Sequence, residues 1–435
     1  MRIQRRRWDG SGAAALAASL RAGVPAPEAI AGDVAALIAD VRERGDEAVL
    51  ELGERFDDGR PAALRVDPER VERALAETDP ELLAALRTAA ANIGAVAEGQ
   101  LASYRPATIL PGQGQEITVS EIAVGAAGVY VPGGRAPYPS TALIGAIPAR
   151  AAGVERVVVA SPVSAAAGGS EPHPAVLAAC AVAGVDEVYA MGGAQAIAAL
   201  AFGTDSVAPV DVIAGPGGPW VQEAKLAVSR WTGIDGYAGP SELVVLADAS
   251  APARWLALDL CAQAEHGADG MLAAIVTDEV LAEQIAADVE QIAADAPSVS
   301  DATLELILAD DAETGLVLAD ELAPEHLEIC CEGAAALARR VRRAGCVFTG
   351  PLGATAFGDY AAGSNHVLPT GGAGRFTGPL GPGTFRRRIS VVEMDPGSAV
   401  ELGGTVETIA RAEGFDVHGA SAKARGEAGS TDNQG

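Results

Sequence analysis

Hydrophobic residues recur at two different spacings along the chain, and the change of spacing separates two regions. Between residues 27 and 100, apolar positions follow one another at steps of three and four, as at Leu37, Ile38 and Val41. This spacing is typical of amphipathic helices. From about Ile117 onward, short β-branched runs alternate with alanine-rich stretches. The pattern therefore predicts a helical region followed by alternating strands and helices.

The alternating region contains two cycles of expected elements. In the first, strands are expected at 129–131, 157–160, 212–214 and 243–246, with helices such as 174–183 and 194–202 between them. In the second, helices are expected at 252–263 and 280–295, and strands at 271–277, 307–309 and 345–349. Strand and helix in alternation imply βαβ units on parallel sheets with both faces covered. We predict an α/β fold with two parallel-sheet units preceded by helices.

Composition narrows the class of protein. The chain has 435 residues, 49% of them apolar, and a net charge of −27 from 31 Lys+Arg against 58 Asp+Glu. So large an acidic excess argues against a nucleic-acid partner, which needs a cationic surface. The apolar stretches fall short of the ~20 residues that cross a bilayer, so we expect no membrane association. Residues 420–435 have little apolar content and are expected to form a mobile tail.

Cysteine and lysine usage add two expectations. The five cysteines are few, and Cys330 and Cys331 are adjacent, which suits no disulfide scaffold. The basic N-terminus leads into no apolar segment of a secretory signal. We therefore expect a reduced, cytoplasmic protein. The two lysines, Lys225 and Lys423, lie outside any P-loop pattern and outside every candidate site named below.

A G-x-G-x-x-A pattern occurs at Gly10, Gly12 and Ala15. No apolar strand is expected before it, so we interpret it as a chance match in a chain rich in glycine and alanine. Spacing alone therefore does not indicate a dinucleotide cofactor.

The five histidines are the best pointers to chemistry. His173 lies between two prolines and is interpreted as an exposed loop residue. Gln263 and His266 are three apart near the end of an expected helix at 256–266, so they share a face. An amide oxygen and an imidazole on one face suit a metal such as Zn²⁺. The alternative is a polar helix end, where histidine favours the C-terminal dipole.

Glu325 and His326 follow Pro324, a residue favoured at the first position of a helix. We expect both in a first helical turn, where the dipole disfavours a protonated imidazole. His326 would then be neutral, as a general base must be. The alternative is an acidic first turn with an incidental histidine.

Two further acid and histidine pairs lie near the C-terminus: Asp359 with His366, around a loop with two glycines, and Glu413 with His418. Taken singly, each is better explained as a solvated polar loop. Taken together, the motifs predict a four-ligand N/O metal site made by Gln263, His266, Asp359 and His418. Glu325 and His326 would form an acid and base pair that does not bind the metal.

At this point the chain resembles the histidinol dehydrogenase family, from about Ala35 to His418. The resemblance depends on several motifs in order: GVYVPGG at 128–134, GGAQAI at 192–197, AGPSE at 238–242, QAEH at 263–266, PEHLE at 324–328, and GDY at 358–360 followed by NHVLP at 365–369. It implies a homodimeric enzyme, dependent on zinc and NAD, that oxidises L-histidinol to L-histidine through L-histidinal as the last steps of histidine biosynthesis.

The resemblance also implies roles for single residues. One Zn²⁺ per subunit would be held by Gln263, His266, Asp359 and His418, with His418 reaching the partner's metal. Glu325 and His326 would be catalytic. Substrate contacts would come from Ser241, Gln263, His266, His326, Asp359, His366, Glu413 and His418. Cofactor contacts would come from Tyr130, Gln195 and the position of Gly218.

Two departures from the family pattern leave alternatives open. Gly218 stands where the family usually has Asn after Gly-Pro-Gly, and Gly236–Tyr237 differ from many members near the substrate pocket. A related zinc- and NAD-dependent dehydrogenase of another small polyol, such as sulfopropanediol, is one alternative. A zinc- and ligand-binding protein without turnover is another.

The expected fold is α/β with two Rossmann-like, incomplete and duplicated parallel-sheet domains, a helical N-terminal region and a small C-terminal extension. We expect an N-terminal arm or helix at 1–26, a first α/β domain at 27–131 plus 244–381, and a second at 132–243. Residues 382–419 would form the extension that contributes to the partner's active site, and residues 420–435 the tail.

Overall fold

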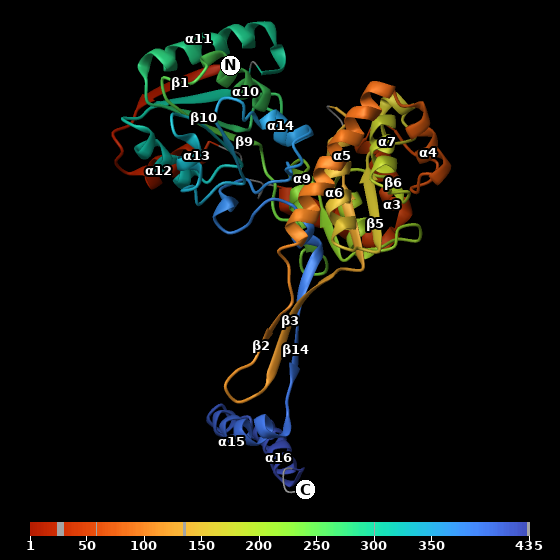
Figure 1. Cartoon of the computed structure of the whole chain (residues 1–435). Helices are drawn as coiled ribbons and strands as arrows, with labels where there is room; N and C mark the ends of the chain where they lie inside the picture. The colour runs from red at the N-terminus through yellow and green to blue at the C-terminus, as the bar shows by residue number, and fades with distance from the viewer. Residues whose placement is uncertain (24–29, 58, 134–135, 300, 433–435) are drawn as a thin grey trace. The chain divides into compact units, whose positions relative to one another are not determined.

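The computed structural model describes residues 1–23, 30–57, 59–133, 136–299 and 301–432 (Figure 1). The chain forms two compact units. Unit 1 comprises Met1–Gly99 and Val124–Phe385, and unit 2 comprises Gln100–Ala123 and Arg386–Gly435. The domain boundary expected between residues 26 and 27 lies outside the described residues, as do 433–435 of the expected tail.

Unit 1 contains two sheets, each with parallel strands only. The first has the order β1-β11-β10-β9-β12-β13. Its strands are β1 (Arg2–Arg7), β9 (Glu242–Ala247), β10 (Met271–Val276), β11 (Thr303–Leu308), β12 (His326–Cys330) and β13 (Cys346–Thr349). The second has the order β6-β5-β4-β7-β8. Its strands are β4 (Ala126–Tyr130), β5 (Arg156–Ser161), β6 (Val188–Ala190), β7 (Val212–Ala214) and β8 (Gly233–Ile234).

The two sheets repeat one topology. Numbered from β4, the strands of the second sheet stand in the order 3-2-1-4-5, and the strands numbered from β9 stand in the same order in the first sheet, with β1 added at its edge. This is the doubly wound order of the Rossmann fold without its sixth strand. The expected fold class, two incomplete and duplicated Rossmann-like units, is confirmed.

The six-stranded sheet is covered on both faces. Leu243 and Val245 of β9 join the core with α10 (Ala253–Ala264) and α11 (Glu279–Asp295), whereas Val244 and Leu246 join the core with α1 (Ala13–Arg21), α12 (Ala312–Leu322) and α13 (Ala334–Ala338). Successive strand residues point to opposite faces, so an unbroken apolar run is what a doubly covered strand needs. Figure 1 shows α10 and α11 on one side of this sheet and α12 and α13 on the other.

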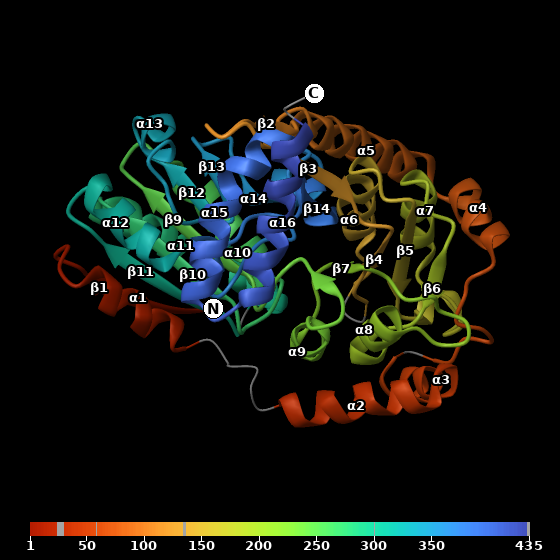
Figure 2. The ribbon, with the colours of Figure 1, turned by 90° about the horizontal axis from the view of Figure 1, so that it is seen from below.

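The five-stranded sheet carries most of the N-terminal helices. Its core includes residues of α2 (Ala31–Arg44) and α3 (Asp46–Phe56) together with α8 (Gly193–Phe202) and α9 (Pro219–Val228) (Figure 2). Helices α6 (Pro139–Ala151) and α7 (Pro174–Val182) pack together elsewhere on this sheet, with α4 (Pro68–Glu77) against α7. Helix α5 spans Pro80–Leu101. The sequence-based boundaries grouped residues 27–131 with 244–381, whereas the contacts of Val34, Ile38 and Leu52 group these helices with the five-stranded sheet.

Unit 2 combines an antiparallel sheet with a helical pair. The sheet has the order β14-β3-β2, with β2 at Ala107–Ile109, β3 at Glu116–Ala123 and β14 at Arg386–Glu393. Helices α15 (Pro396–Ala412) and α16 (Asp416–Asp432) pack against each other. The stretch expected to be a mobile tail from residue 420 is therefore helical as far as Asp432.

Two local expectations are wrong. A strand, β1, does precede the glycines at 10 and 12; its charged residues went unrecognised because β1 is an edge strand and pairs only with β11. Residues after Pro324 begin strand β12 and not a helix. There, Ala323 takes the left-handed conformation (φ 45°) that ends α12, and the buried run His326–Cys330 pairs between β9 and β13.

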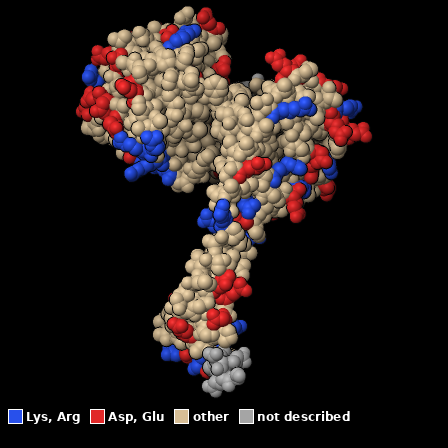
Figure 3. All heavy atoms as spheres, in the orientation of Figure 1, with Lys and Arg blue, Asp and Glu red and all other residues tan. Residues whose placement is uncertain are grey.

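The described helices include none long and apolar enough to cross a membrane. The charged surface is mixed: Figure 3 shows acidic side chains at several separate places on the visible face, with basic ones among them. The acidic excess is thus spread over that face instead of gathered in one patch.

Candidate active site

The candidate acid and base residues meet at the edge of the six-stranded sheet where its strands begin. Glu242 starts β9 and His326 starts β12, and His326 lies opposite Leu243 in the sheet register. Helix α10 connects β9 to β10, so its last turn returns to this same edge with Gln263. The amino ends of the strands and the carboxyl end of a helix therefore frame the site. We call this end of the six-stranded sheet the amino edge.

Two carboxylates, Glu242 and Glu325, are bound to each other's backbone. The backbone N–H of Glu242 donates to Oε2 of Glu325 over 2.8 Å, and the N–H of Glu325 donates to Oε2 of Glu242 over 3.2 Å. Ser241 donates its hydroxyl to the same Glu325 oxygen over 2.9 Å. Both glutamates are buried. This reciprocal bonding fixes where β9 and β12 start relative to each other.

His326 is almost fully buried between two acids. Its Nδ1 lies 3.1 Å from the carbonyl oxygen of Glu242 and 3.5 Å from Oε2 of Glu325, and its Nε2 lies 3.6 Å from Oδ1 of Asp359. Burial lowers the pKa of His326, but the nearby carboxylates of Glu325 and Asp359 outweigh it and raise the pKa well above its usual value. The helix-dipole argument for a neutral imidazole therefore does not apply, because His326 starts a strand and faces carboxylates.

The bond from Nδ1 to the Glu242 carbonyl makes Nδ1 a donor. Nε2 is buried and has no hydrogen-bond partner among the described residues. It is the ring atom with capacity left for a ligand.

Asp359 comes from α14 (Thr355–Tyr360) and sits among histidines. Burial raises its pKa, but His326, His366 and His266 together hold that pKa below the usual range. His366 is fixed at both ring nitrogens: Nδ1 lies 2.9 Å from the Asp359 carbonyl, and Nε2 lies 3.1 Å from the hydroxyl of Thr141 in α6. Asp359 thus keeps an ionised carboxylate, which can bind a cation or a cationic ligand.

Gln263 is buried and donates its side-chain N–H to Ser241 over 2.7 Å. That bond turns the amide so that Oε1 is the atom left to bind something else. His266 is exposed just beyond the end of α10, close enough to Asp359 to act on its charge. Within the described ranges, no cluster of three or more His, Cys, Asp and Glu side chains is assembled to hold a metal. Of the four expected ligands, three lie in the same region of unit 1: Gln263, His266 and Asp359.

Glu413 and His418 lie in unit 2. Glu413 ends α15, and His418 lies in the first turns of α16, with its ring edge-on to Phe415 at 5.3 Å between centroids. Both are exposed. Their roles as substrate and metal contacts stay predictions.

The expected cofactor residues lie where the strands of the five-stranded sheet end. We call this end of a sheet its carboxyl edge. Tyr130 ends β4, Gln195 lies in the first turn of α8 after β6, and Gly218 caps α9 after β7. Burial raises the pKa of Tyr130, whose hydroxyl accepts the N–H of Gly193 over 3.0 Å. The Nε2 of Gln195 is buried without a partner among the described residues. The gap between β4 and β7, where the strand order reverses, is the usual ligand position in such sheets.

The loop after β7 is pinned by a buried ion pair that the sequence analysis did not foresee. Lys225 in α9 and Asp235 after β8 contact each other, and their side chains are 0% and 2% exposed. Lys225 donates to the carbonyl of Gly215 over 3.0 Å, and Asp235 accepts the N–H of Gly215 over 2.7 Å. Lys225 therefore does take part in a candidate site. The signal for it was the scarcity of lysine, since Lys225 is one of only two in the chain.

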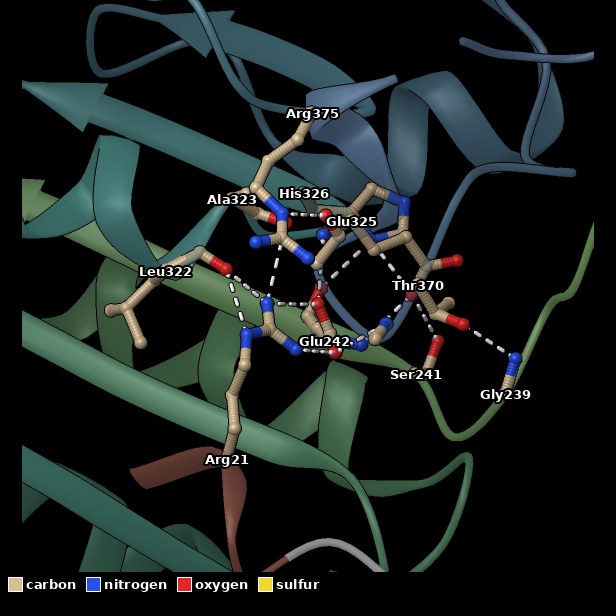
Figure 4. A network of polar contacts seen from close by, with 12 residues as sticks. Arg21, Gly239, Ser241, Glu242, Leu322, Ala323, Glu325, His326, Thr370 and Arg375 are labelled. Atoms are coloured by element: carbon tan, nitrogen blue, oxygen red, sulfur yellow. Dashed lines mark hydrogen bonds and ion pairs between the residues drawn. The ribbon is translucent and has the colours of Figure 1, made fainter. Parts of the chain in front are cut away.

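Two further residues of the amino edge were also missed. Arg21, at the end of α1, binds the Glu242 carboxylate with two nitrogens, at 2.7 and 3.1 Å (Figure 4). Glu242 was quoted only as part of a motif. Nothing local marked Arg21, because it meets Glu242 only through the fold.

The chain is similar to known proteins over most of its length. Residues 23–426 match the family model for histidinol dehydrogenase. The chain belongs to the histidinol dehydrogenase family. It is 42% identical over 393 residues to histidinol dehydrogenase of Thermobifida fusca, with 89% of each chain covered. It is 41% identical over 405 residues to that of Haloarcula marismortui, with 92% of this chain and 94% of the relative covered. The crystal structure of histidinol dehydrogenase from Elizabethkingia anophelis superposes with a TM-score of 0.86 at 30% identity, covering 92% of each chain.

As a member of the histidinol dehydrogenase family, the protein is an oxidoreductase. The matched range contains every residue of both edges described above except Arg21, which precedes it by two positions. The family match therefore covers the residues of both edges, and Arg21 lies just outside it.

Proposed function

We propose that the protein oxidises L-histidinol to L-histidine in two successive hydride transfers to NAD, with Zn²⁺ at the amino edge of the six-stranded sheet. The observation that carries the proposal is the packing of the buried His326 imidazole between two acids, with Glu325 at Nδ1 and Asp359 at Nε2. Membership of the histidinol dehydrogenase family supports the substrate.

In this proposal His326 takes the proton of the substrate hydroxyl at Nε2. That atom is available because Nδ1 is committed to the Glu242 carbonyl and Nε2 has no described hydrogen-bond partner. To accept a proton, His326 must be neutral, and its raised pKa depends on the charges of Glu325 and Asp359. A cation held by Asp359 would offset one of these charges and lower the pKa toward the working range of a base.

Glu325 serves the second oxidation. An aldehyde must add water before it can give up a second hydride, and a carboxylate next to the first base can deprotonate that water. Ser241 and the backbone of Glu242 hold Oε2 of Glu325 in place. Because Glu325 and His326 are adjacent, both half-reactions occur in one site and the aldehyde need not leave.

The residues present fit a zinc ion. An amide oxygen at Gln263, an imidazole at His266 and an ionised carboxylate at Asp359 are N/O donors that Zn²⁺ accepts. The carboxyl end of α10 adds negative potential, which favours a cation. His418 would complete the set. When bound, the ion orients the amino and imidazole nitrogens of histidinol and stabilises developing negative charge.

The residues at the carboxyl edge fit a dinucleotide. Helices α8 and α9 begin there with Gly192 and Gly218 as their N-caps, and helix N-termini attract phosphate groups. Gly215 has φ 126°, and an added Cβ would overlap the carbonyl oxygen of Tyr130. Such a loop allows close approach of backbone to ligand. The unpartnered Nε2 of Gln195 supplies a buried donor.

A second copy of the chain is part of the proposal. In unit 2, the buried residues among those described are only Ser398, Gly403, Ala410 and Gly419. Large apolar side chains are exposed instead, including Val392, Ile409, Phe415 and Val417. A unit with so little core needs a partner surface to be stable, and such exposed apolar area marks an interface. Glu413 and His418 lie beside these residues in sequence, which supports the proposal that they serve the partner's site.

The experiment is turnover of L-histidinol with zinc and NAD, comparing the wild type with His326→Asn. The variant removes the base and not a ligand, so activity should fall by about 10²- to 10⁴-fold. Zinc measured by elemental analysis should stay at one per subunit. Loss of zinc in this variant, or full activity with zinc retained, would contradict the roles given to His326.

A further inference from the structure

We propose that Arg21 is a positioning residue that holds the Glu325–His326 pair in its reactive arrangement by fixing Glu242. The inference rests on the proposed function, because it gives Arg21 a task in that reaction.

Arg21 links the start of β9 to the carboxyl end of α12. Its Nη1 and Nη2 nitrogens donate to the two carboxylate oxygens of Glu242, at 2.7 and 3.1 Å. Its Nε donates to the carbonyl of Leu322 over 2.9 Å, and Nη2 also donates to the carbonyls of Leu322 and Ala323. Figure 4 shows the guanidinium between the start of β9 and the end of α12. One planar group therefore fixes both ends of the corner that leads into Glu325.

The carbonyls that Arg21 binds belong to a strained turn. Ala323 is the one non-glycine residue with positive φ among those described, at 45°. Alanine takes this conformation only when its surroundings impose it. The turn directs Pro324 and Glu325 back toward β9, so the hydrogen bonds from Arg21 stabilise the conformation on which the position of Glu325 depends.

Glu242 passes this constraint to both catalytic residues. Its side chain accepts the N–H of Glu325, its own N–H donates to the Glu325 carboxylate, and its carbonyl lies 3.1 Å from Nδ1 of His326. The N–H of Gly371 adds a further bond to Glu242, at 2.9 Å. Every polar atom of Glu242 is thus engaged, and Arg21 is the cation that balances its buried charge.

The bonding pattern requires a guanidinium. Two oxygens of one carboxylate and two carbonyls on the other side need a planar fork with several donors, which lysine lacks. Among the described residues, Arg21 makes no hydrogen bond or ion pair with the side chains of Glu325 and His326, so its effect should fall on the rate of the chemical step and not on ligand binding.

The test compares Arg21→Met and Arg21→Lys in the full chain. A shift of about 1 Å in a reacting group can cost about a hundredfold in rate. We expect kcat to fall by about that factor in Arg21→Met, with the KM for NAD and the zinc content unchanged, and by less in Arg21→Lys. Guanidinium ion added at millimolar concentration should partly restore kcat in Arg21→Met and leave Arg21→Lys unchanged.

The matched control is Arg6→Met. Arg6 lies on the same N-terminal segment and also binds a glutamate with two nitrogens, Glu305 at 3.0 and 2.7 Å, but far along the sheet from Glu325. Its kcat should equal that of the wild type. Combining Arg21→Met with Glu242→Gln should lower kcat no further than the worse single variant, because both act through one connection.

An unchanged kcat in Arg21→Met, or multiplicative losses in the double variant, would overturn the inference. Should the wild type itself fail to oxidise histidinol, the proposed function fails separately. The inference is then decided by a crystal structure of Arg21→Lys or Arg21→Met. A displaced Glu325 carboxylate would support it, and an unmoved one would overturn it.

Discussion

The two sheets of unit 1 share one strand order but present their candidate ligand groups at opposite edges. In the five-stranded sheet, Tyr130, Gln195 and Gly218 lie where strands end and helices begin. In the six-stranded sheet, Glu242 and His326 lie where strands begin and α10 ends. Helix N-termini favour anions and C-termini favour cations. The same topology therefore provides one edge suited to a phosphate-bearing cofactor and another suited to a metal and a cationic substrate.

The carboxyl edges of the two sheets differ in their local hydrogen bonds. The carboxyl edge of the six-stranded sheet is closed by its own hydrogen bonds: Asp248 after β9 accepts the N–H groups of Ser250 and Glu332, at 3.0 and 2.7 Å. In the other sheet, the loop after β7 is held at the backbone of Gly215 by Lys225 and Asp235. Duplication of a fold thus does not duplicate its ligand site. The predictions below test this division of labour, beginning with the largest effect.

The first test removes a ligand from the amino edge. His266→Asn should lose bound zinc and at least about a hundredfold in activity, because orientation of the substrate contributes several kcal/mol. NAD binding, measured by calorimetry, should be unchanged. His173→Asn is the matched control, since His173 caps α7 by accepting the N–H of Ala175 at 3.1 Å and Asn can replace that cap. Unchanged zinc in His266→Asn would show that the ligand set is wrong.

The second test breaks the ion pair under the carboxyl edge. Lys225→Met leaves Asp235 buried without its cation, which should lower the free energy of unfolding by roughly 3–5 kcal/mol. The KM for NAD should rise because the Gly215 loop loses its anchor. Chemical denaturation checks the first effect and steady-state kinetics the second. Lys423→Met, at an exposed ion pair with Glu407, should change stability by less than about 1 kcal/mol. Equal effects of the two substitutions would argue against a special role for Lys225.

The third test adds one methyl group to the Gly215 loop. Gly215→Ala forces a side chain onto a backbone at φ 126° and into the Tyr130 carbonyl, and should cost about 1–3 kcal/mol and weaken NAD binding. Gly218→Ala is the control, because Gly218 has φ −64° and an added Cβ meets nothing within 4 Å. Zinc content should be normal in both. Tolerance of alanine at 215 would remove the argument for close backbone approach.

The smallest expected effect comes from Gly218→Asn, which restores the residue usual in the family. The backbone at 218 accepts any side chain, so the loop should keep its shape. One regained hydrogen bond should lower the KM for NAD roughly three- to tenfold. A KM that stays the same would mean that this chain binds the cofactor without contact at this position.

Sequence patterns predicted most of the two sheets, because strands buried on both faces are continuous β-branched runs and the helices between them are long. They failed at β1, whose charged residues do not look like a strand, and at Pro324, where a favourable helix start is overridden by sheet pairing. The candidate residues of the amino edge were found because histidines are rare here. Arg21 was not, since Glu242 lies far away in sequence and only the fold brings the two together. The Lys225–Asp235 pair was not either, although its residues are near in sequence, because they belong to different elements and the scarcity of lysine alone does not name a partner.

The most direct test of the account is the number of NADH molecules formed for each L-histidinol consumed by the zinc-loaded enzyme. The account predicts two, because Glu325 and His326 serve successive oxidations at one amino edge while NAD is exchanged at the carboxyl edge of the other sheet. A ratio of one, or no NADH at all, would contradict it.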